Sequence, residues 1–318
     1  MITTNNARTT WGRTVLGLAL AAFAGPALAQ DDYPDGTVEL IVPFNAGGGT
    51  DGVVRVFQPH FAEALGTDVV VRNVSGASGT VGTGTAAQAD PDGYTVGYIP
   101  IGPLAIQPIL RPLQYDAESW EYVCQTTDNP TFVMVSAGSG IDTLDALAEG
   151  GPLVYGSSGP GTIPHLAMAA VSKALGVEST HVPYDGTGPA MNALAGGEIT
   201  AFVDQPQVVR SNDVTPLAIL AAERHPEFPD VPTAAELGHE GLEFSVWQGM
   251  VVPAGTPGQA VEALSAACEA ALTSEGFTQA AEQANIALKY RNGPAFADFV
   301  RRNTETNRAI LQDAGLAQ

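Results

Sequence analysis

Apolar runs and helical stretches alternate in the first third of the chain. Residues 38–42, 68–72 and 95–99 are short apolar runs that predict buried strands. Residues 52–65 and 82–89 lie between these runs and have the composition of helices. A β-α-β-α-β order of this kind predicts a parallel sheet with helices on its faces.

The same alternation returns in the middle of the chain. We expect strands at residues 153–156, 179–183, 199–203 and 217–221, and helices at 163–175 and 188–194. The chain becomes strand-like again at residues 243–252, and two helices are then expected to reach the C-terminus. Two similar α/β halves in one chain indicate two domains.

A long strand-like run joins the two halves. It extends over residues 122–135, after a proline-rich passage, and is interrupted by Asn129-Pro130. Such a strand can leave one domain and enter the next. We therefore expect a split first domain of residues 30–130 plus 248–318, a second domain of 131–247, and a hinge of two crossing strands.

The N-terminus has the pattern of a secretory signal peptide. Arg8 and Arg13 precede an apolar stretch of residues 14–25, and Ala27-Leu28-Ala29 is a typical cleavage site. The apolar stretch is shorter than the roughly 20 residues of a membrane span. Residues 1–29 are thus predicted to be removed after export, which leaves a periplasmic protein that begins at Gln30.

Charge and cysteine content narrow the choice of partners. The formal net charge is −21 at pH 7, with 34 acidic and 13 basic residues, which excludes nucleic acid as a partner. Cys124 and Cys268 are the two cysteines. An oxidising compartment allows them to form one disulfide, and two buried thiols are the alternative.

Four polar, glycine-rich loops follow predicted strands. They cover residues 44–51, 73–80, 156–162 and 184–189. Glycine lets the backbone approach a ligand, and the N–H groups at a helix start attract anions. Tight turns with capping side chains are the alternative. Four loops in two similar halves favour a shared ligand cleft.

Motifs of catalysis and of cofactor binding are incomplete in this chain. No Gly-x-Ser-x-Gly elbow occurs, and neither Lys173 nor Lys289 follows a glycine as in a P-loop. Residues 82–87 imitate a dinucleotide fingerprint, but no acidic residue follows at the required distance, so we interpret them as helix packing. The five histidines show no zinc spacing. We expect no metal, no cofactor and no enzymatic activity.

The order and spacing of these motifs resemble the substrate-binding component of tripartite tricarboxylate transporters, the TctC or Bug family. The matching residues are Tyr33-Pro34, Ile41-Val42-Pro43-Phe44, Gly47-Gly48, Thr50-Asp51, Asn73, Gly76-Ala77-Ser78-Gly79, Asp92-Gly93-Tyr94-Thr95, Ser157 to Thr162, His165-Leu166-Ala167, Val182-Pro183-Tyr184, Gly186 to Ala190, Gly196-Gly197, Val231-Pro232-Thr233 and Glu236. Asn45, Ser75 and Ser78 depart from the usual pattern and put the identity of the ligand in doubt.

The resemblance implies an α/β, two-domain periplasmic binding protein of type II, in which each domain is a mostly parallel sheet flanked by helices. Its two lobes would close around a small carboxylate and present it to the membrane permease subunits of a transporter. We expect a monomer. The alternative is a small-molecule sensor or a hydrolase-like enzyme on the same two-lobed fold.

The predicted ligand site gathers residues from the four loops and from neighbouring strand ends. Its members are Phe44, Asn45, Ala46, Gly47, Gly48, Thr50, Asp51, Ser75, Gly76, Ala77, Ser78, Gly102, Ser157, Ser158, Gly161, Thr162, His165, Tyr184, Thr187 and Asp204. Loop 157–162 is the expected carboxylate cradle, in which Gly159 and Gly161 let the backbone turn its N–H groups inward and Ser157, Ser158 and Thr162 add hydroxyl donors. No arginine lies inside the four loops, so neutral donors are expected to bind the anion.

Two of these residues have open alternatives. Asp204 would contact an amino or hydroxyl group of the ligand, or would cap the helix after Pro206. His165 would lie at the edge of the cleft, or would be a hydrogen-bonded structural histidine, which we favour.

Overall fold

The computed structural model describes residues 1–4 and 33–313 of the 318-residue chain. The cleavage site and nearly all of the predicted signal peptide lie outside the described residues. The chain from Tyr33 onward forms one compact unit. No helix of this described part is long and apolar enough to cross a membrane.

Strands and helices alternate along this unit. The strands are β1 Val38–Val42, β2 Val69–Asn73, β3 Thr95–Pro100, β4 Trp120–Ser136, β5 Leu153–Ser157, β6 Ser179–Pro183, β7 Phe202–Asp204, β8 Val214–Leu220, β9 Ser245–Pro253 and β10 Leu288–Asn292. The α-helices are α1 Gly49–Leu65, α2 Thr80–Ala87, α3 Gln107–Leu110, α4 Leu144–Glu149, α5 Ile163–Ala174, α6 Thr187–Ala195, α7 Pro206–Ser211, α8 Gly258–Thr273, α9 Glu275–Gln283 and α10 Gly293–Asp313.

The first lobe is built on a sheet with the strand order β10-β4-β9-β3-β1-β2. Strands β3, β1 and β2 are parallel, as the β-α-β-α-β pattern predicts. Strands β4, β9 and β10 add antiparallel pairs, so the sheet as a whole is mixed. The ring of Phe57 packs against Phe61, Tyr98 and Phe277 in the core between the sheet and its helices.

Strand β4 connects the two lobes because its pairing partners change along its length. Its first part pairs with β9 as far as Pro130. From Thr131 onward it pairs with β8 and, at residues 132–134, with β7. The predicted interruption at Asn129-Pro130 is therefore the point where the partners change. Proline carries no N–H to donate, which suits a position where one ladder ends and another begins.

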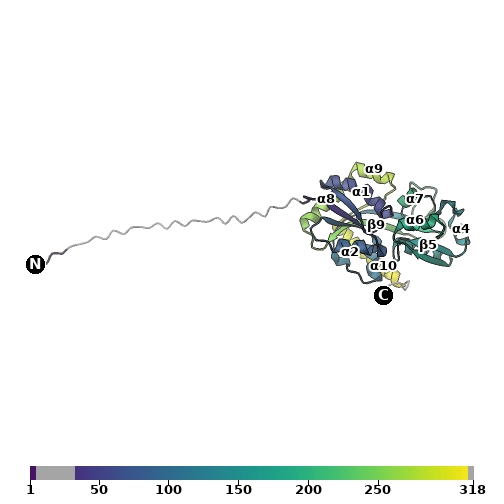
Figure 1. Cartoon of the computed structure of the whole chain (residues 1–318), viewed down its shortest axis with the longest axis horizontal. Helices are drawn as coiled ribbons and strands as arrows, with labels where there is room; N and C mark the ends of the chain where they lie inside the picture. Colours follow the sequence, from purple (N-terminus) through teal and green to yellow (C-terminus); the bar gives the residue numbers. More distant parts are fainter. Residues whose placement is uncertain (5–32, 314–318) are drawn as a thin grey trace. The chain divides into compact units, whose positions relative to one another are not determined.

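The second lobe contains the remainder of β4 together with β5 to β8. Strands β5 and β6 are parallel, and a bridge between Tyr155 and Ala201 joins β5 to the chain before β7. Two apolar cores lie on this sheet, around Val133 and around Phe132. In Figure 1 the elements α4, α6, α7 and β5 lie together, apart from α1, α2, α8 and α9. The domain limits 30–130 plus 248–318 and 131–247 remain our proposal.

The C-terminal region differs from the prediction of two helices. It contains three helices, α8 to α10, and the additional strand β10. Helix α8 ends before Ser274, whose hydroxyl accepts a hydrogen bond from the N–H of Phe277 and so caps α9. A single serine between two alanine-rich stretches was too weak a signal to separate these helices.

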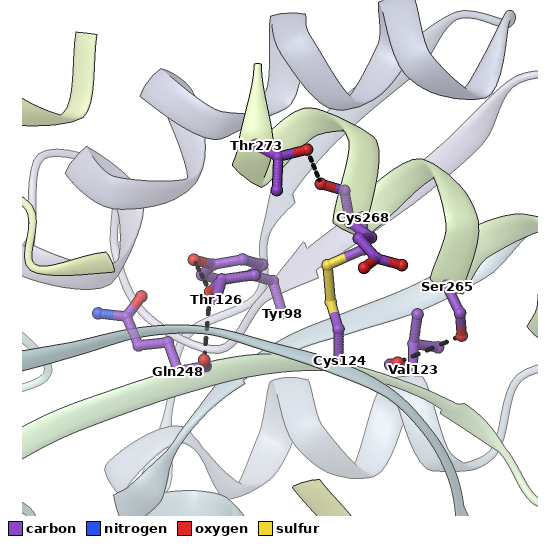
Figure 2. The surroundings of a disulfide bond; sticks show 9 residues. Tyr98, Val123, Cys124, Thr126, Gln248, Ser265, Cys268 and Thr273 are labelled. Atoms are coloured by element: carbon purple, nitrogen blue, oxygen red, sulfur yellow. Dashed lines mark hydrogen bonds between the residues drawn. A yellow bond between two sulfur atoms is a disulfide. The ribbon is translucent and has the colours of Figure 1, made fainter. Parts of the chain in front are cut away.

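A disulfide joins β4 to α8. Cys124 and Cys268 are bonded, with their α-carbons 6.7 Å apart. Both are fully buried in the core that contains Tyr98. Figure 2 shows the bridge between the strand and the helix, near Val123 and Ser265, whose backbone carbonyl and hydroxyl are hydrogen-bonded. The cross-link lies within the first lobe and does not restrain the hinge directly.

Candidate ligand-binding site

A cavity of about 40 Å³ lies where the glycine-rich loops of the two lobes meet. It is larger than the roughly 10–15 Å³ that one water molecule needs. Its lining residues are Phe44, Gly48, Gly49, Thr50, Pro100, Ile101, Gly102, Pro103, Ser158, Thr162, Ile163, Pro164, Thr187, Asp204, Gln205 and Val246. We call this the first cavity. Asp204 is the one ionisable side chain in the set.

Three helices begin at the first cavity. Helix α1 contributes Gly49 and Thr50, α5 contributes Ile163, and α6 contributes Thr187. The N-terminus of an α-helix has unpaired N–H groups and a partial positive charge, both of which favour an anion. Pro164, the second residue of α5, has no N–H to offer. The convergence of helix starts from both lobes favours an anionic ligand even though no lysine or arginine lines this cavity.

Gln205 is positioned by the strands of the hinge. Asn129 of β4 and Gln248 of β9 each donate a hydrogen bond from their amide nitrogen to Gln205 Oε1, both at 2.8 Å. The orientation of the Asn129 amide follows from its Oδ1, which accepts from the N–H of Ala287 at 2.7 Å. The Gln205 amide nitrogen therefore faces Gly49 across the cavity. Gln205 lines the first cavity, where its side chain also hydrogen-bonds to the carboxylate of Asp204, and the sequence prediction missed it.

Asp204 lies deep in the first cavity. Its carboxylate accepts hydrogen bonds from Thr187 Oγ1 at 2.6 Å and from the N–H of Gln205 at 2.9 Å. Burial raises the pKa of Asp204 to about 6, because the cost of desolvating the charge exceeds the effect of these hydrogen bonds. The cap of α7 is Gln205 and has no side-chain hydrogen bond, so the helix-cap alternative for Asp204 is wrong.

Loop 157–162 uses most of its own donors. The Ser157 hydroxyl donates to Gly159 O and accepts from the N–H of Gly159, while Thr162 Oγ1 also donates to Gly159 O. The N–H of Gly161 donates to His165 Nδ1 at 3.0 Å. The backbone N–H groups of Gly159, Gly161 and Thr162 are therefore bonded within the protein and do not contribute to the expected cradle. Ser158 lines the first cavity with no hydrogen bond to another described residue.

Two half-buried histidines support this loop. The His165 ring stacks on His181 at 4.0 Å, and His181 Nε2 lies 2.6 Å from Ser157 Oγ. Burial lowers the pKa of His165, and burial together with the neighbouring His165 lowers that of His181 to about 4. Both rings are neutral at pH 7 and add no positive charge to the site. Ser157 is fully buried and lines neither the first cavity nor its neighbour.

The loops of the two lobes touch across the first cavity. A β-carbon at Gly49 would come within 2.5 Å of Gln205 Nε2, and one at Gly159 would come within 2.5 Å of Ser78 Oγ. Asn45 Nδ2 donates to Asp185 O at 2.5 Å, a further bond between the two halves. Glycine at these positions is required by the close approach of one lobe to the other.

The structure divides the predicted site residues into three groups. Those that line the first cavity are Phe44, Gly48, Thr50, Gly102, Ser158, Thr162, Thr187 and Asp204. Those that line a neighbouring second cavity are Ala77, Ser78 and Tyr184. Those that line neither are Asn45, Ala46, Gly47, Asp51, Ser75, Gly76, Ser157, Gly161 and His165.

Asp51 belongs to the third group and has a supporting role. It accepts hydrogen bonds from the N–H of Gly47, from Asn73 Nδ2 and from Arg55 Nε, all at 2.8–2.9 Å. Burial alone would raise the pKa of Asp51, but these hydrogen bonds outweigh it and lower the pKa. Asp51 therefore holds loops 44–51 and 73–80 together and lines neither cavity.

The sequence prediction missed several residues that line the cavities. Gln205 follows Asp204 directly, and its position after a strand was a usable signal. Three apolar residues near the ends of β3 and β9 also line the first cavity, namely Ile101, Pro103 and Val246. An apolar residue near a strand end gives no sign of ligand binding in the sequence, so these could not be singled out. Arg111 lines the second cavity from a segment outside all four loops.

No group of three or more histidine, cysteine or acidic side chains among the described residues could hold a metal ion.

Residues 82–87 show why their glycines imitate a nucleotide-binding motif. A β-carbon at Gly82 would lie 2.3 Å from the carbonyl oxygen of Val74 and 2.7 Å from the α-carbon of Pro43. Helix α2 packs directly on the chain beside β1 and β2 at this point. The interpretation of these residues as helix packing is consistent with that geometry.

Comparison with solved structures shows the same fold throughout. The periplasmic binding protein BugD is 31% identical with a TM-score of 0.84, over 90% of this chain and 99% of its own. MatC from Rhodopseudomonas palustris with bound malate is 29% identical with a TM-score of 0.80, over 88% of this chain and 100% of its own. R. palustris Rpa4515 with adipate is also 29% identical with a TM-score of 0.82, over 90% of this chain and 99% of its own. The predicted two-domain α/β binding-protein fold is confirmed.

Sequence comparison gives the family. Protein BugT of Bordetella pertussis is 34% identical over 275 residues, which are 83% of this chain and 84% of the relative. Residues 53–316 match the model of the tripartite tricarboxylate transporter family receptor, TctC. The chain therefore belongs to the TctC family of tripartite tricarboxylate transporter receptors, among the periplasmic solute-binding proteins.

Proposed function

We propose that this protein captures a small carboxylate in the periplasm and delivers it to the permease subunits of a tripartite tricarboxylate transporter. The observation that carries the proposal is the convergence of the starts of α1, α5 and α6 on one cavity between two hinged lobes. Helix starts favour anions, and a carboxylate is an anion of a size that a small cavity can hold. Malate and adipate in two relatives of the same fold support this ligand class.

The proposed mechanism uses neutral donors. Gln205 Nε2, the Ser158 hydroxyl and the free N–H groups at the start of α1 would bind the carboxylate. Contacts from both lobes make the ligand part of the interface, so binding favours the conformation in which the loops meet. The permease would then recognise that conformation. No catalysis is required, and the buried position of Ser157 argues against a hydrolase.

A thermal-shift screen tests the ligand class. Di- and tricarboxylates, acidic amino acids, aromatic acids and neutral sugars would each be added to the purified mature chain. A ligand at 100 times its dissociation constant stabilises the folded state by about 2.7 kcal/mol, which gives a clear rise in melting temperature. We expect at least one carboxylate to do so, and it should be recovered unchanged after incubation. A rise with sugars alone, or turnover of the acid, would overturn the proposal.

A further inference from the structure

A second cavity, of about 440 Å³, lies next to the first cavity. Both cavities are lined by loop 157–162, since Ser158 lines the first cavity and Gly159 lines the second. Ser78 and Arg111 reach the second cavity from the first lobe, and Tyr184 and Asp185 reach it from the second lobe. A ligand bound in the first cavity could extend into this space past loop 157–162.

The guanidinium of Arg111 is held in a defined position at the second cavity. Its Nε donates to Gln107 Oε1 at 2.9 Å, its Nη2 donates to the same oxygen, and Nη2 also donates to Ala77 O at 3.2 Å. Gln107 is fully buried, and its own amide nitrogen donates to Pro160 O at 2.6 Å. Arg111 is thus oriented through a buried glutamine that is itself tied to loop 157–162.

Arg111 has no acidic partner among the residues that the structure describes. The ion pairs in this part of the chain involve Arg55, Arg72, Arg210, Arg224 and Arg301. In a chain with 34 acidic residues and a net charge of −21, Arg111 is an oriented arginine that lines a cavity and has no carboxylate within 4.0 Å. Gln107 and Ala77 use the Nε and Nη2 donors of Arg111, so Nη1 is the nitrogen left to donate to a carboxylate.

Ser78 provides an independent observation at the same cavity. The side chain is 6% exposed, and its hydroxyl oxygen is buried without a hydrogen-bond partner in the described structure. Buried hydroxyl groups nearly always have a partner, so an unpaired one indicates a group that is missing from its surroundings. A ligand oxygen beside Arg111 would supply that partner.

We propose that the second cavity is a subsite for a second carboxylate of the same ligand, bound by Arg111 and Ser78. This inference rests on the proposed function, because it takes the first carboxylate to occupy the first cavity. The favoured substrates are therefore dicarboxylates long enough to pass loop 157–162. Asp185 lines the same cavity and disfavours an anion on its side, so the second carboxylate lies on the side of Arg111 and Ser78.

Calorimetric titration with straight-chain mono- and dicarboxylic acids of four to eight carbons tests the subsite. The wild-type mature chain should bind at least one dicarboxylate about 10- to 100-fold more tightly than the monocarboxylate of equal length. Arg111→Gln should abolish that difference and leave the monocarboxylate affinity unchanged. Ser78→Gly should reduce the difference, and glycine suits the positive φ of 61° at this position.

Arg301→Gln is the matched control, because it removes the same charge from an exposed ion pair with Asp298. It should leave both affinities unchanged. Asp185→Asn should retain or strengthen dicarboxylate binding. If Arg111 and Asp185 instead formed a latch between the lobes, both variants would weaken mono- and dicarboxylates equally, and the subsite would be wrong.

The outcomes also separate the subsite from the function on which it rests. If the wild-type protein binds neither class of acid, the proposed function and the subsite are both wrong. If it binds both classes and Arg111→Gln changes neither affinity, the subsite alone is wrong. Circular dichroism and melting temperature show whether Arg111→Gln is folded, and Ser78→Gly decides the question if it is not.

Discussion

The Ser158 hydroxyl is a free donor on loop 157–162, where the hydroxyls of Ser157 and Thr162 are bonded within the loop. Ser158→Ala should weaken carboxylate binding about 10- to 100-fold, because a hydrogen bond to a charged group is worth about 1.5–3 kcal/mol. Its melting temperature should hardly change. Thr162→Ala should lower both affinity and stability, since it also removes the hydrogen bond to Gly159 O.

Ser172→Ala is the control for Ser158→Ala. Ser172 is a buried serine of α5 that donates to Met168 O and does not line the first cavity. Its replacement should lower stability slightly and leave affinity intact. Calorimetry and thermal melting on the three variants check these expectations. An unchanged affinity in Ser158→Ala would mean that the anion binds elsewhere.

Asp204 predicts a pH dependence of stability. Its pKa of about 6 in the folded chain lies above the ordinary value near 3.9 in an unfolded chain. Between these values the folded state holds a proton that the unfolded state has lost. The free energy of unfolding should therefore fall as pH rises from about 4 to 6, by up to about 3 kcal/mol, and this contribution should be constant above that range.

Urea unfolding at pH 4, 5, 6 and 7 measures this contribution. Asp204→Asn should lack the fall, because asparagine does not titrate. From pH 4 to 6, the free energy of unfolding of the wild type should therefore fall relative to that of the variant. Parallel pH profiles for the two proteins would contradict the raised pKa.

Asp204 should also select for ligands with an amino group. Above pH 6 its carboxylate carries a charge inside the first cavity, where an ammonium group can pair with it. Asp204→Asn is expected to weaken the binding of aspartate far more than that of succinate, which differs by the amino group alone. Calorimetry at pH 7.5 with both acids measures this. Equal losses would show that Asp204 acts on the structure of the site and not on the ligand.

At the scale of elements, the bond between Cys124 and Cys268 ties the hinge strand β4 to α8. A cross-link over 144 residues restricts the unfolded chain, so the double variant Cys124→Ala, Cys268→Ala should lose about 3–5 kcal/mol of stability. Ligand affinity should not change, since both residues lie in the core of the first lobe. Thiol titration of the unfolded, unreduced wild type should find no free thiol, and two per chain would contradict the bond.

At the scale of the whole molecule, binding depends on how closely the lobes approach each other. Gly49 faces Gln205 across the first cavity, and an added β-carbon would lie 2.5 Å from the Gln205 amide nitrogen. Gly49→Ala should therefore hold the lobes apart and weaken all carboxylates at least about tenfold. Small-angle scattering should show that ligand reduces the radius of gyration of the wild type and not of this variant.

Gly52→Ala is the matched control for Gly49→Ala. It lies in the same helix, and its added β-carbon would meet nothing closer than Gln207 Cγ at 3.9 Å. Affinity and ligand-induced compaction should remain, with a small gain in stability from the better helix former. Similar losses of affinity in both variants would show that the effect comes from α1 and not from contact between the lobes.

Local patterns were sufficient for much of the architecture. The strands β1, β2 and β3 and the helices between them could be predicted, because strands of a parallel sheet that is covered by helices leave short continuous apolar runs in the chain. Strand β4 was predicted with its crossing role, since Asn129-Pro130 marks the change of partners. The four glycine-rich loops, the family and Asp204 could likewise be identified from the residues alone. Glycines mark places where the backbone approaches another group closely, and an acidic residue at the end of a strand is visible in the local sequence.

The identity of the donors at the site depends on contacts between distant segments. Asn129, Gln248 and Ala287 orient the amides around Gln205 at the first cavity, and the buried Gln107 orients Arg111 at the second cavity. Conversely, the N–H of Gly161 is unavailable because His165 accepts it. Each donor is available to a ligand only if no other group already binds it. The groups that compete for these donors lie up to 158 positions apart in the sequence. Only the tertiary structure therefore determines which donors remain available to a ligand.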